Sequence, residues 1–168
     1  MTFEYRRTRG VNASVVRVFN TYGPRMSIND GRVVPAFIAA ALAGRPLPVF
    51  GDGRQTRSLC FVSDLVAALL LVAFDGNANG HVFNLGNPHE VTMLELAQAV
   101  SDAAGGDGGV VFSSAAADDP ARRRPDITRM RRRYGWEPRV ALSEGLRETV
   151  SYFRGALREP ARLAAEAA

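Results

Sequence analysis

The sequence of 168 residues predicts an α/β fold, and three observations support this class. Short apolar runs rich in β-branched residues alternate with segments that repeat apolar residues at helical spacing, which is typical of α/β domains. Glycine, proline and asparagine separate these segments, as expected for turns. Hydrophobic residues make up 46% of the chain, which is enough to bury a core.

The first part of the chain alternates helix, strand and helix. Thr2–Arg9 is predicted to be helical, and Gly10 suits the left-handed position that ends a helix. Ser14–Phe19 is apolar on both faces, which is typical of a strand inside a parallel sheet. A loop over Asn20–Gly31 then leads to a helix over Val34–Leu42.

The middle of the chain predicts a hairpin followed by a helix. Pro48–Phe50 and Gln55–Val62 flank an Asp-Gly pair, which is a frequent hairpin turn. Ser63 is expected to cap the next helix through its hydroxyl group. The apolar run Leu65–Phe74 is too short to cross a bilayer, so it indicates a buried helix.

The last part of the chain opens with a short predicted strand, Val82–Leu85, and Thr92–Glu95 then fits the capping box of a helix that ends near Ala104. The remaining predictions are, in order, a strand over Val110–Phe112, a polar loop to Asp119, a short helix capped by Asp126 and ended by Tyr134-Gly135, and a last helix opened by Ser143.

The composition excludes several kinds of site. All 21 basic residues are arginine, so the chain has no lysine for a Schiff base, a Walker-type phosphate site or a Tyr–Lys acid/base pair. The single cysteine, Cys60, excludes a disulfide scaffold and a cysteine-based zinc cluster. The charged first residues lack the apolar run of a secretory signal, so we expect a cytoplasmic protein with no membrane partner.

Few residues other than arginine suggest chemistry. His81 and His89 have no second ligand at helical spacing, and Cys60 lies in an apolar strand, so we interpret all three as structural. Arg129 and the arginines at 131–133 surround a short helix without interleaved aromatic residues, which favours a solvated helix over a nucleic-acid surface.

Single arginines in turns are better candidates for a site. Arg25, Arg32 and Arg57 stand alone in loops or at strand ends, unlike the run of three arginines at 122–124. A planar guanidinium gives paired hydrogen bonds to phosphate oxygens, so such residues suit a diphosphate, although a scattered surface location is about equally compatible with each of them.

Five segments, taken in order, resemble the extended short-chain dehydrogenases/reductases that act on nucleotide sugars, the NAD-dependent epimerase/dehydratase family. They are Arg-Val-Phe-Asn-Thr-Tyr-Gly-Pro-Arg at 17–25, Leu-Pro-Val-Phe-Gly-Asp-Gly-Arg-Gln-Thr-Arg at 47–57, Phe-Val-Ser-Asp-Leu at 61–65, Phe-Asn-Leu-Gly-Asn-Pro at 83–88, and Asp118 to Ile127 followed by Gly-Trp-Glu-Pro at 135–138. The resemblance extends from Met1 to the region of Arg154.

Within this family, Gly31-Arg32-Val33-Val34 together with the segments at 83–88 and 118–127 is most similar to the UDP-glucuronate decarboxylases, or UDP-xylose synthases. The resemblance implies that bound NAD oxidises the sugar at C4, that the resulting keto acid loses CO2, and that the NADH still in place reduces the 4-keto pentose to UDP-xylose.

The resemblance also implies a domain organisation. The chain corresponds to the C-terminal portion of an extended Rossmann-type fold: 1–30 is the end of the core with an incomplete parallel sheet, 31–158 is mainly the small nucleotide-sugar-binding region, and 159–168 is a tail. The family's Tyr-x-x-x-Lys and glycine-rich NAD motifs do not occur in this sequence. We therefore expect NAD to be held mainly by an N-terminal half, the chain alone to be inactive, and a full-length enzyme to be a homodimer.

The site residues are carried over from the family one by one. Tyr5 and Asn20 are expected to contact the substrate, Pro48 and Phe50 to flank the uracil, and Arg57 and Arg124 to neutralise the diphosphate of a UDP-sugar, while Thr21 and Arg32 are expected to approach NAD. Many relatives have tyrosine where Phe50 stands, so here only packing is expected. No catalytic or metal-binding residue is expected in this chain.

Two other interpretations stay open. A dTDP-glucose 4,6-dehydratase or a UDP-sugar 4-epimerase of the same family shares these motifs. A non-catalytic, basic binding module is the alternative from another class. A salt-dependent affinity for nucleic acid without a response to UDP would favour the basic module.

Overall fold

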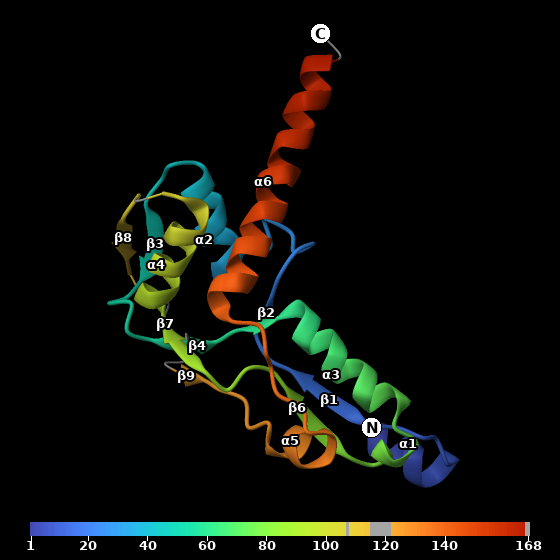
Figure 1. The fold of residues 1–168 in the computed structure, drawn as a ribbon. Helices are drawn as coiled ribbons and strands as arrows, with labels where there is room; N and C mark the ends of the chain where they lie inside the picture. Colours follow the sequence, from blue (N-terminus) through green and yellow to red (C-terminus); the bar gives the residue numbers. More distant parts are fainter. Residues whose placement is uncertain (107, 115–121, 167–168) are drawn as a thin grey trace. The chain divides into compact units, whose positions relative to one another are not determined.

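The computed structural model describes residues 1–106, 108–114 and 122–166, and it confirms the α/β class (Figure 1). The chain forms two compact units that interleave along the sequence. Unit 1 comprises Met1–Thr21, Ser58–Glu90 and Arg123–Val140, and unit 2 comprises Tyr22–Arg57, Val91–Arg122 and Ala141–Ala168.

Unit 1 is built on a parallel pair of strands. β1 (Val15–Val18) lies beside β6 (Val82–Leu85) (Figure 1). The register of the pair places Val15 opposite Val82. Parallel strands need a crossover, and α3 (Val62–Phe74) supplies it. The unit also contains α1 (Thr2–Arg9), the short helix η1 (Gly76–Ala78) and α5 (Thr128–Tyr134).

The core of unit 1 lies between this pair of strands and its helices. Phe83 and Leu85 of β6, Ala68 of α3, Met130 of α5 and Trp136 are all buried in one cluster. The predicted strand at 82–85 is confirmed, and so is the end of α1, since Gly10 has φ 67° and donates its N–H to the Arg6 carbonyl.

Unit 2 is built on a second parallel pair. β3 (Leu47–Phe50) pairs with β8 (Val110–Ser113), and α2 (Val33–Leu42), α4 (Met93–Ala104) and α6 (Leu142–Glu166) complete the unit (Figure 1). Its buried side chains include Phe37, Leu47, Leu96, Leu146 and Phe153. The predicted capping box of α4 is present, because Thr92 Oγ1 accepts the Glu95 N–H and Glu95 accepts the Thr92 N–H.

Five further short strands occur in the described residues. β2 (Thr21–Tyr22) pairs with β5 (Cys60–Phe61), and β7 (Glu90–Thr92), β4 (Thr56–Ser58) and β9 (Arg122–Arg123) form a sheet in that order. β2 interrupts what the sequence predicted as a continuous loop over 20–31.

The predicted hairpin over residues 48–62 is wrong. β3 pairs with β8, and β4 belongs to another sheet. Gly51 donates its N–H to the Ser113 carbonyl, which continues the β3–β8 pairing, while the carbonyls of Gly53 and Gln55 accept the first N–H groups of α4. β3 therefore pairs with a strand that is distant in sequence, and not with the strand that follows the Asp-Gly pair.

The start and the surroundings of α3 also differ from the prediction. The helix begins at Val62 with Phe61 as its N-cap, so Ser63 lies inside the first turn and does not cap. Asp64 instead accepts the N–H groups of Arg139 and Val140, both at 3.0 Å.

α3 is buried along one stripe only. Leu65, Ala68 and Val72 are buried, whereas Val66, Leu70 and Phe74 are exposed by 46%, 52% and 85%. The helix covers one face of a pair of strands, and two strands can bury only one side of the helix. No helix in the described ranges combines the length and apolar character that a membrane span requires.

The last two predicted helices are confirmed, with different boundaries. Asp126 Oδ1 accepts the Thr128 N–H at the start of α5, and Gly135 ends that helix with φ 60°. α6 begins at Leu142 and continues to Glu166, past the point where the sequence suggested a tail. The predicted loop over 113–119 lies largely outside the described residues.

Candidate nucleotide-sugar site

Asn20 and Thr21 follow the carboxyl end of β1, the edge at which parallel α/β sheets bind their ligands. The Asn20 carbonyl accepts the Cys60 N–H at 2.9 Å, so the backbone at this point is fixed. Thr21 Oγ1 donates to the Phe19 carbonyl at 2.9 Å, and its oxygen can still accept a hydrogen bond. Both residues are half-buried.

Tyr5 lies on α1 and is 56% exposed, so its hydroxyl group is accessible to a ligand. All eight residues of α1 are exposed. The helix therefore presents Tyr5 from the surface of unit 1.

Arg124 lines a pocket of about 260 Å³ in unit 1. The pocket is formed by Pro88, Arg124, Pro125, Asp126, Ile127, Thr128 and Arg131. Arg124 Nη1 lies 3.7 Å from Glu90 Oε2, and half of the arginine side chain is exposed. This ion pair is loose and its arginine is half-exposed, which leaves guanidinium donors available to an anion.

Arg32 precedes α2 and is bound to Asp30 in unit 2. Asp30 Oδ1 accepts the Arg32 N–H at 2.9 Å, and Oδ2 accepts its Nε at 2.7 Å. Partial burial alone would raise the pKa of Asp30, but the hydrogen bonds and charge of Arg32 hold that pKa below its ordinary value. Asp30 thus orients the guanidinium, which stays 61% exposed.

Pro48 and Phe50 point to the same face of β3, because side chains two residues apart share a face. The buried residues Leu47 and Val49 take the opposite face. Phe50 is 55% exposed, so its ring is free to stack on a flat ligand ring.

Arg57 differs from the prediction of an arginine standing in a loop or at a strand end. It lies within β4 and is only 8% exposed, and its Nη1 donates to the Thr56 carbonyl at 2.8 Å. Burial fixes this side chain far more firmly than those of Arg32 and Arg124.

The predicted site residues are divided between the two units. Unit 1 carries Tyr5, Asn20, Thr21 and Arg124, and unit 2 carries Arg32, Pro48, Phe50 and Arg57. In unit 1, Asn20 and Thr21 are neighbours along the chain. In unit 2, Pro48 and Phe50 lie on one face of β3.

The structural interpretation of Cys60 agrees with its surroundings. The side chain is fully buried, and burial, with a smaller contribution from the Asp64 charge, raises the pKa of the thiol to about 12. His81 contacts the ring of Phe83 with a centroid distance of 6.1 Å. Within the described ranges, no group of three His, Cys, Asp or Glu residues could hold a metal ion.

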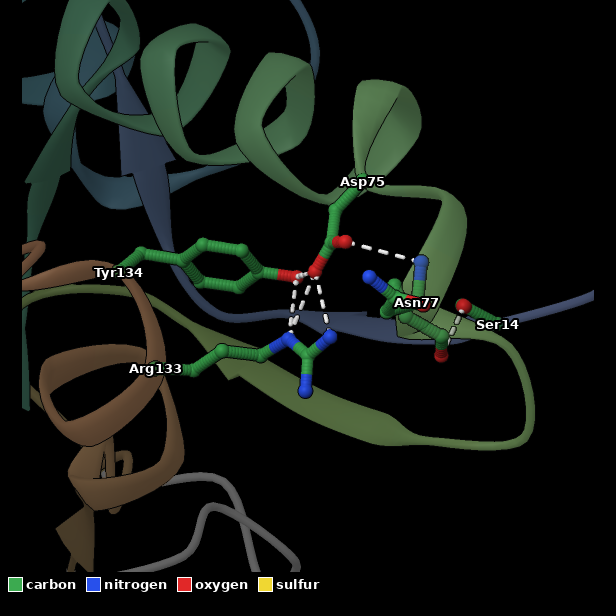
Figure 2. A network of polar contacts seen from close by, with 6 residues as sticks. Ser14, Asp75, Asn77, Arg133 and Tyr134 are labelled. Carbon is green, nitrogen blue, oxygen red and sulfur yellow. Dashed lines mark hydrogen bonds and ion pairs between the residues drawn. The ribbon is translucent and has the colours of Figure 1, made fainter.

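Figure 2 shows a polar network that the sequence does not predict. Asp75 Oδ2 accepts hydrogen bonds from Arg133 Nε at 2.7 Å and from the Tyr134 hydroxyl at 2.9 Å. The hydrogen bond from Arg133, followed by the N–H of Asn77, lowers the pKa of Asp75 to about 2. These groups satisfy one another, so the network is structural.

The arginines of α5 are therefore more than a solvated face. Arg129 donates to the Val82 carbonyl at 3.0 Å, Arg131 pairs with Glu137 at 2.6 Å, and Arg133 binds Asp75. Their partners lie far away in sequence or beyond the helix. In contrast, the Asp30–Arg32 pair has a sequence signal, since an aspartate in a turn commonly accepts the backbone N–H group two residues further along the chain.

Sequence comparisons identify the relatives. A profile of the NAD dependent epimerase/dehydratase family matches residues 1–86. The chain is 50% identical over 154 residues to UDP-glucuronic acid decarboxylase 4 of Arabidopsis thaliana, covering 92% of this chain and 34% of that protein. It is 46% identical over 161 residues to UDP-glucuronic acid decarboxylase 1 of Xenopus tropicalis, covering 96% of this chain and 38% of that protein.

Solved structures agree on the fold. A UDP-glucose 4-epimerase from Thermotoga maritima, solved with UDP-glucose, has a TM-score of 0.86 and 34% identity over 92% of this chain and 50% of that one. A dTDP-glucose 4,6-dehydratase from Streptomyces venezuelae, solved with NAD and TYD bound, has a TM-score of 0.80 and 28% identity over 90% of this chain and 47% of that one.

The chain thus spans less than half the length of these decarboxylases and at most half that of these solved proteins. The profile match covers the first 86 of its 168 residues, and the predicted Rossmann-related fold is confirmed. The chain belongs to the NAD dependent epimerase/dehydratase family.

Proposed function

We propose that this chain is the nucleotide-sugar-binding part of a UDP-glucuronate decarboxylase. The observation that carries the proposal is its 50% identity to a UDP-glucuronic acid decarboxylase over 154 residues. The 34% identity to a UDP-glucose 4-epimerase makes an epimerase the second candidate.

In this proposal, unit 2 binds the uracil and the diphosphate. The ring of Phe50 stacks on the base and Pro48 packs beside it, supported by their common face on β3 and by the exposure of the phenyl ring. Arg57 neutralises the diphosphate from β4, where its burial reduces the entropy lost on binding an anion.

Unit 1 contributes contacts to the sugar and the diphosphate. The amide of Asn20 hydrogen-bonds the substrate from the end of β1, and Tyr5 offers a hydroxyl group from α1. Arg124 binds a diphosphate oxygen when its long contact with Glu90 is exchanged for a phosphate.

The cofactor of the family is NAD, which supplies a hydride acceptor and donor when bound. The residues proposed to contact NAD suit that cofactor. The Arg32 guanidinium is exposed and oriented by Asp30, and the Thr21 oxygen can still accept a hydrogen bond. In this proposal Arg32 approaches an anionic part of NAD and Thr21 accepts a hydrogen bond from it. Most of the binding energy comes from the glycine-rich half of the family fold, and the full-length enzyme is a homodimer.

Calorimetry with UDP and the complete chain tests the nucleotide contacts. We expect Phe50→Ala to weaken UDP binding by about five- to a hundredfold, the range given by loss of one stacking contact. Phe112→Ala is the matched control, since Phe112 is 56% exposed but pairs with Val49 and so lies on the other face of the sheet. Equal effects of the two substitutions, or no UDP binding at all, would contradict the proposal.

The choice between decarboxylase and epimerase depends on the sugar. We expect UDP-glucuronate to bind more tightly than UDP-glucose and dTDP-glucose when the three are titrated into the same preparation. A preference for UDP-glucose would favour the epimerase, and binding of RNA that weakens with salt, without UDP binding, would favour a basic binding module.

A further inference from the structure

All eight residues of α1 are exposed, so burial does not hold this helix in place. Contacts outside the helix must therefore decide where it lies, and Arg6 makes one.

Arg6 binds the turn that precedes β6. Its Nε donates to Asn79 Oδ1 at 2.8 Å. The same oxygen accepts the Ala13 N–H at 3.2 Å, and the Gly80 N–H donates to the Ala13 carbonyl at 2.8 Å. Asn79 thus joins α1 to the segment that leads from α1 into β1.

Gly80 makes room for this contact. Its φ is +82°, and a Cβ at this position would lie 2.8 Å from Arg6 Cζ and 2.9 Å from Nε. The guanidinium therefore lies directly against the Gly80 backbone, at a position where any side chain would displace it.

The turn that receives Arg6 is itself anchored on its other side. Asp75 binds Arg133 and Tyr134 of α5, and the Ser14 hydroxyl donates to the Ala78 carbonyl at 2.6 Å (Figure 2). The turn over residues 75–80 is consequently a fixed point for three segments: α5, the start of β1 and α1.

We propose that Asn79 and Gly80 are positioning residues that hold α1 through Arg6, so that the adjacent Tyr5 faces the nucleotide sugar. This inference rests on the proposed function, because it assigns Tyr5 a contact with that substrate. Asn79 and Gly80 touch no substrate themselves and act only through α1.

The test combines hydrogen exchange of the α1 amides with calorimetry of UDP-glucuronate, using the complete chain. We expect Asn79→Ala to abolish the protection of the α1 amides and to lower the affinity about three- to tenfold, the effect of one lost hydrogen bond. Asn79→Asp keeps the acceptor oxygen, so the protection of the α1 amides and the affinity should both match those of the unmodified chain. Gly80→Ala should cause the same loss of protection and affinity, because its methyl group would displace the Arg6 guanidinium.

Arg7→Ala is the matched control, since the Arg7 side chain bonds to Glu4 within the same helix, and both measurements should stay unchanged. A double variant separates positioning from general destabilisation: once Tyr5 is replaced by phenylalanine, Asn79→Ala should cause no further loss of affinity. Additive losses would overturn the proposal, as would unchanged protection in Asn79→Ala.

The two proposals fail in different ways. If the unmodified chain does not bind UDP-glucuronate, the proposed function fails, and with it the role of Tyr5. The exchange measurements would then still report whether Asn79 and Gly80 hold α1. If UDP-glucuronate binds but Asn79→Ala changes neither measurement, only the positioning proposal fails.

Discussion

At the scale of the residue, each arginine takes its role from the group that it meets. Arg57 is buried and bonds a backbone carbonyl, Arg32 is oriented by Asp30, and Arg133 is held by Asp75. Arg124 has a partner at 3.7 Å and a half-exposed side chain. The same residue type thus serves as a fixed cation, an oriented cation, a structural tie and an available donor.

The Asp75 network predicts that the stability of the folded chain decreases at low pH. The pKa of the Asp75 carboxyl is about 2 in the folded chain and about 3.9 in the unfolded chain. The charged carboxylate therefore stabilises the fold fully above the unfolded pKa, and this stabilisation is lost as the pH falls towards the folded pKa. We expect Asp75→Asn to lower the free energy of unfolding at pH 7, with a difference from the unmodified chain that shrinks below pH ~4.

Denaturant unfolding at several pH values measures this difference. Asp52→Asn is the control, because Asp52 and Arg54 are both exposed and their charged atoms lie 3.9 Å apart. A pH-independent difference for Asp75→Asn would show that its charge has no part in the network.

The buried thiol of Cys60 predicts chemical inertness. With its pKa near 12, almost no thiolate is present at pH ~8, and the sulfur is inaccessible. We expect a thiol-specific reagent to leave the native chain unmodified and to react promptly with one thiol in guanidinium. Prompt reaction without denaturant would mean that the β5 region opens readily.

At the scale of the element, turns decide which strands pair. The Asp-Gly pair at 52–53 has the composition of a hairpin turn, but Gly53 is packed under Leu94 of α4 and its carbonyl accepts the Leu94 N–H at 3.2 Å. Contact with α4 therefore directs the chain away from β3.

This packing predicts the effect of a single methyl group. A Cβ on Gly53 would lie 2.7 Å from Leu94 Cγ at a φ of +74°, so Gly53→Ala should destabilise unit 2 by about 2–4 kcal/mol through overpacking and backbone strain together. Gly44→Ala is the matched control, since Gly44 has a similar φ of +63° but open space around its Cβ position, and should cost only about 1–2 kcal/mol.

Thermal unfolding of both variants tests this prediction. Equal losses in the two would show that Leu94 yields to the methyl group and that the backbone conformation alone sets the cost.

At the scale of the whole molecule, unit 1 exposes a stripe of apolar residues. Val66, Leu70 and Phe74 follow one another at four-residue spacing on α3, and Val18 is 52% exposed on β1. In the described part of the chain, β1 pairs with β6 alone, so its other edge offers open backbone groups.

These features predict concentration-dependent association of the chain. Sedimentation velocity should show larger species as the concentration rises, and replacing both Leu70 and Phe74 by glutamate should suppress them. Ser63→Glu adds a charge to the same exposed helix without removing apolar surface, so it should have little effect. A monodisperse monomer at all concentrations would contradict this prediction.

Local patterns predicted most elements, because their causes lie within a few residues. The Thr92–Glu95 capping box and the helix ends at Gly10 and at Tyr134-Gly135 were correct for this reason. The hairpin was wrong because its deciding partners, α4 and β8, are distant in sequence. The Ser63 cap was wrong because α3 begins one residue earlier, at Val62. The site residues came from the resemblance, and their roles remain proposals.

The sequence by itself determined the α/β class, the family and the identity of the residues proposed to bind a nucleotide sugar. Only the tertiary structure decided that Arg57 is buried, that Asp30 orients Arg32, and that Asn79 and Gly80 receive Arg6. Periodicity and capping depend on neighbours along the chain, whereas burial and ion pairing depend on segments that meet only after folding.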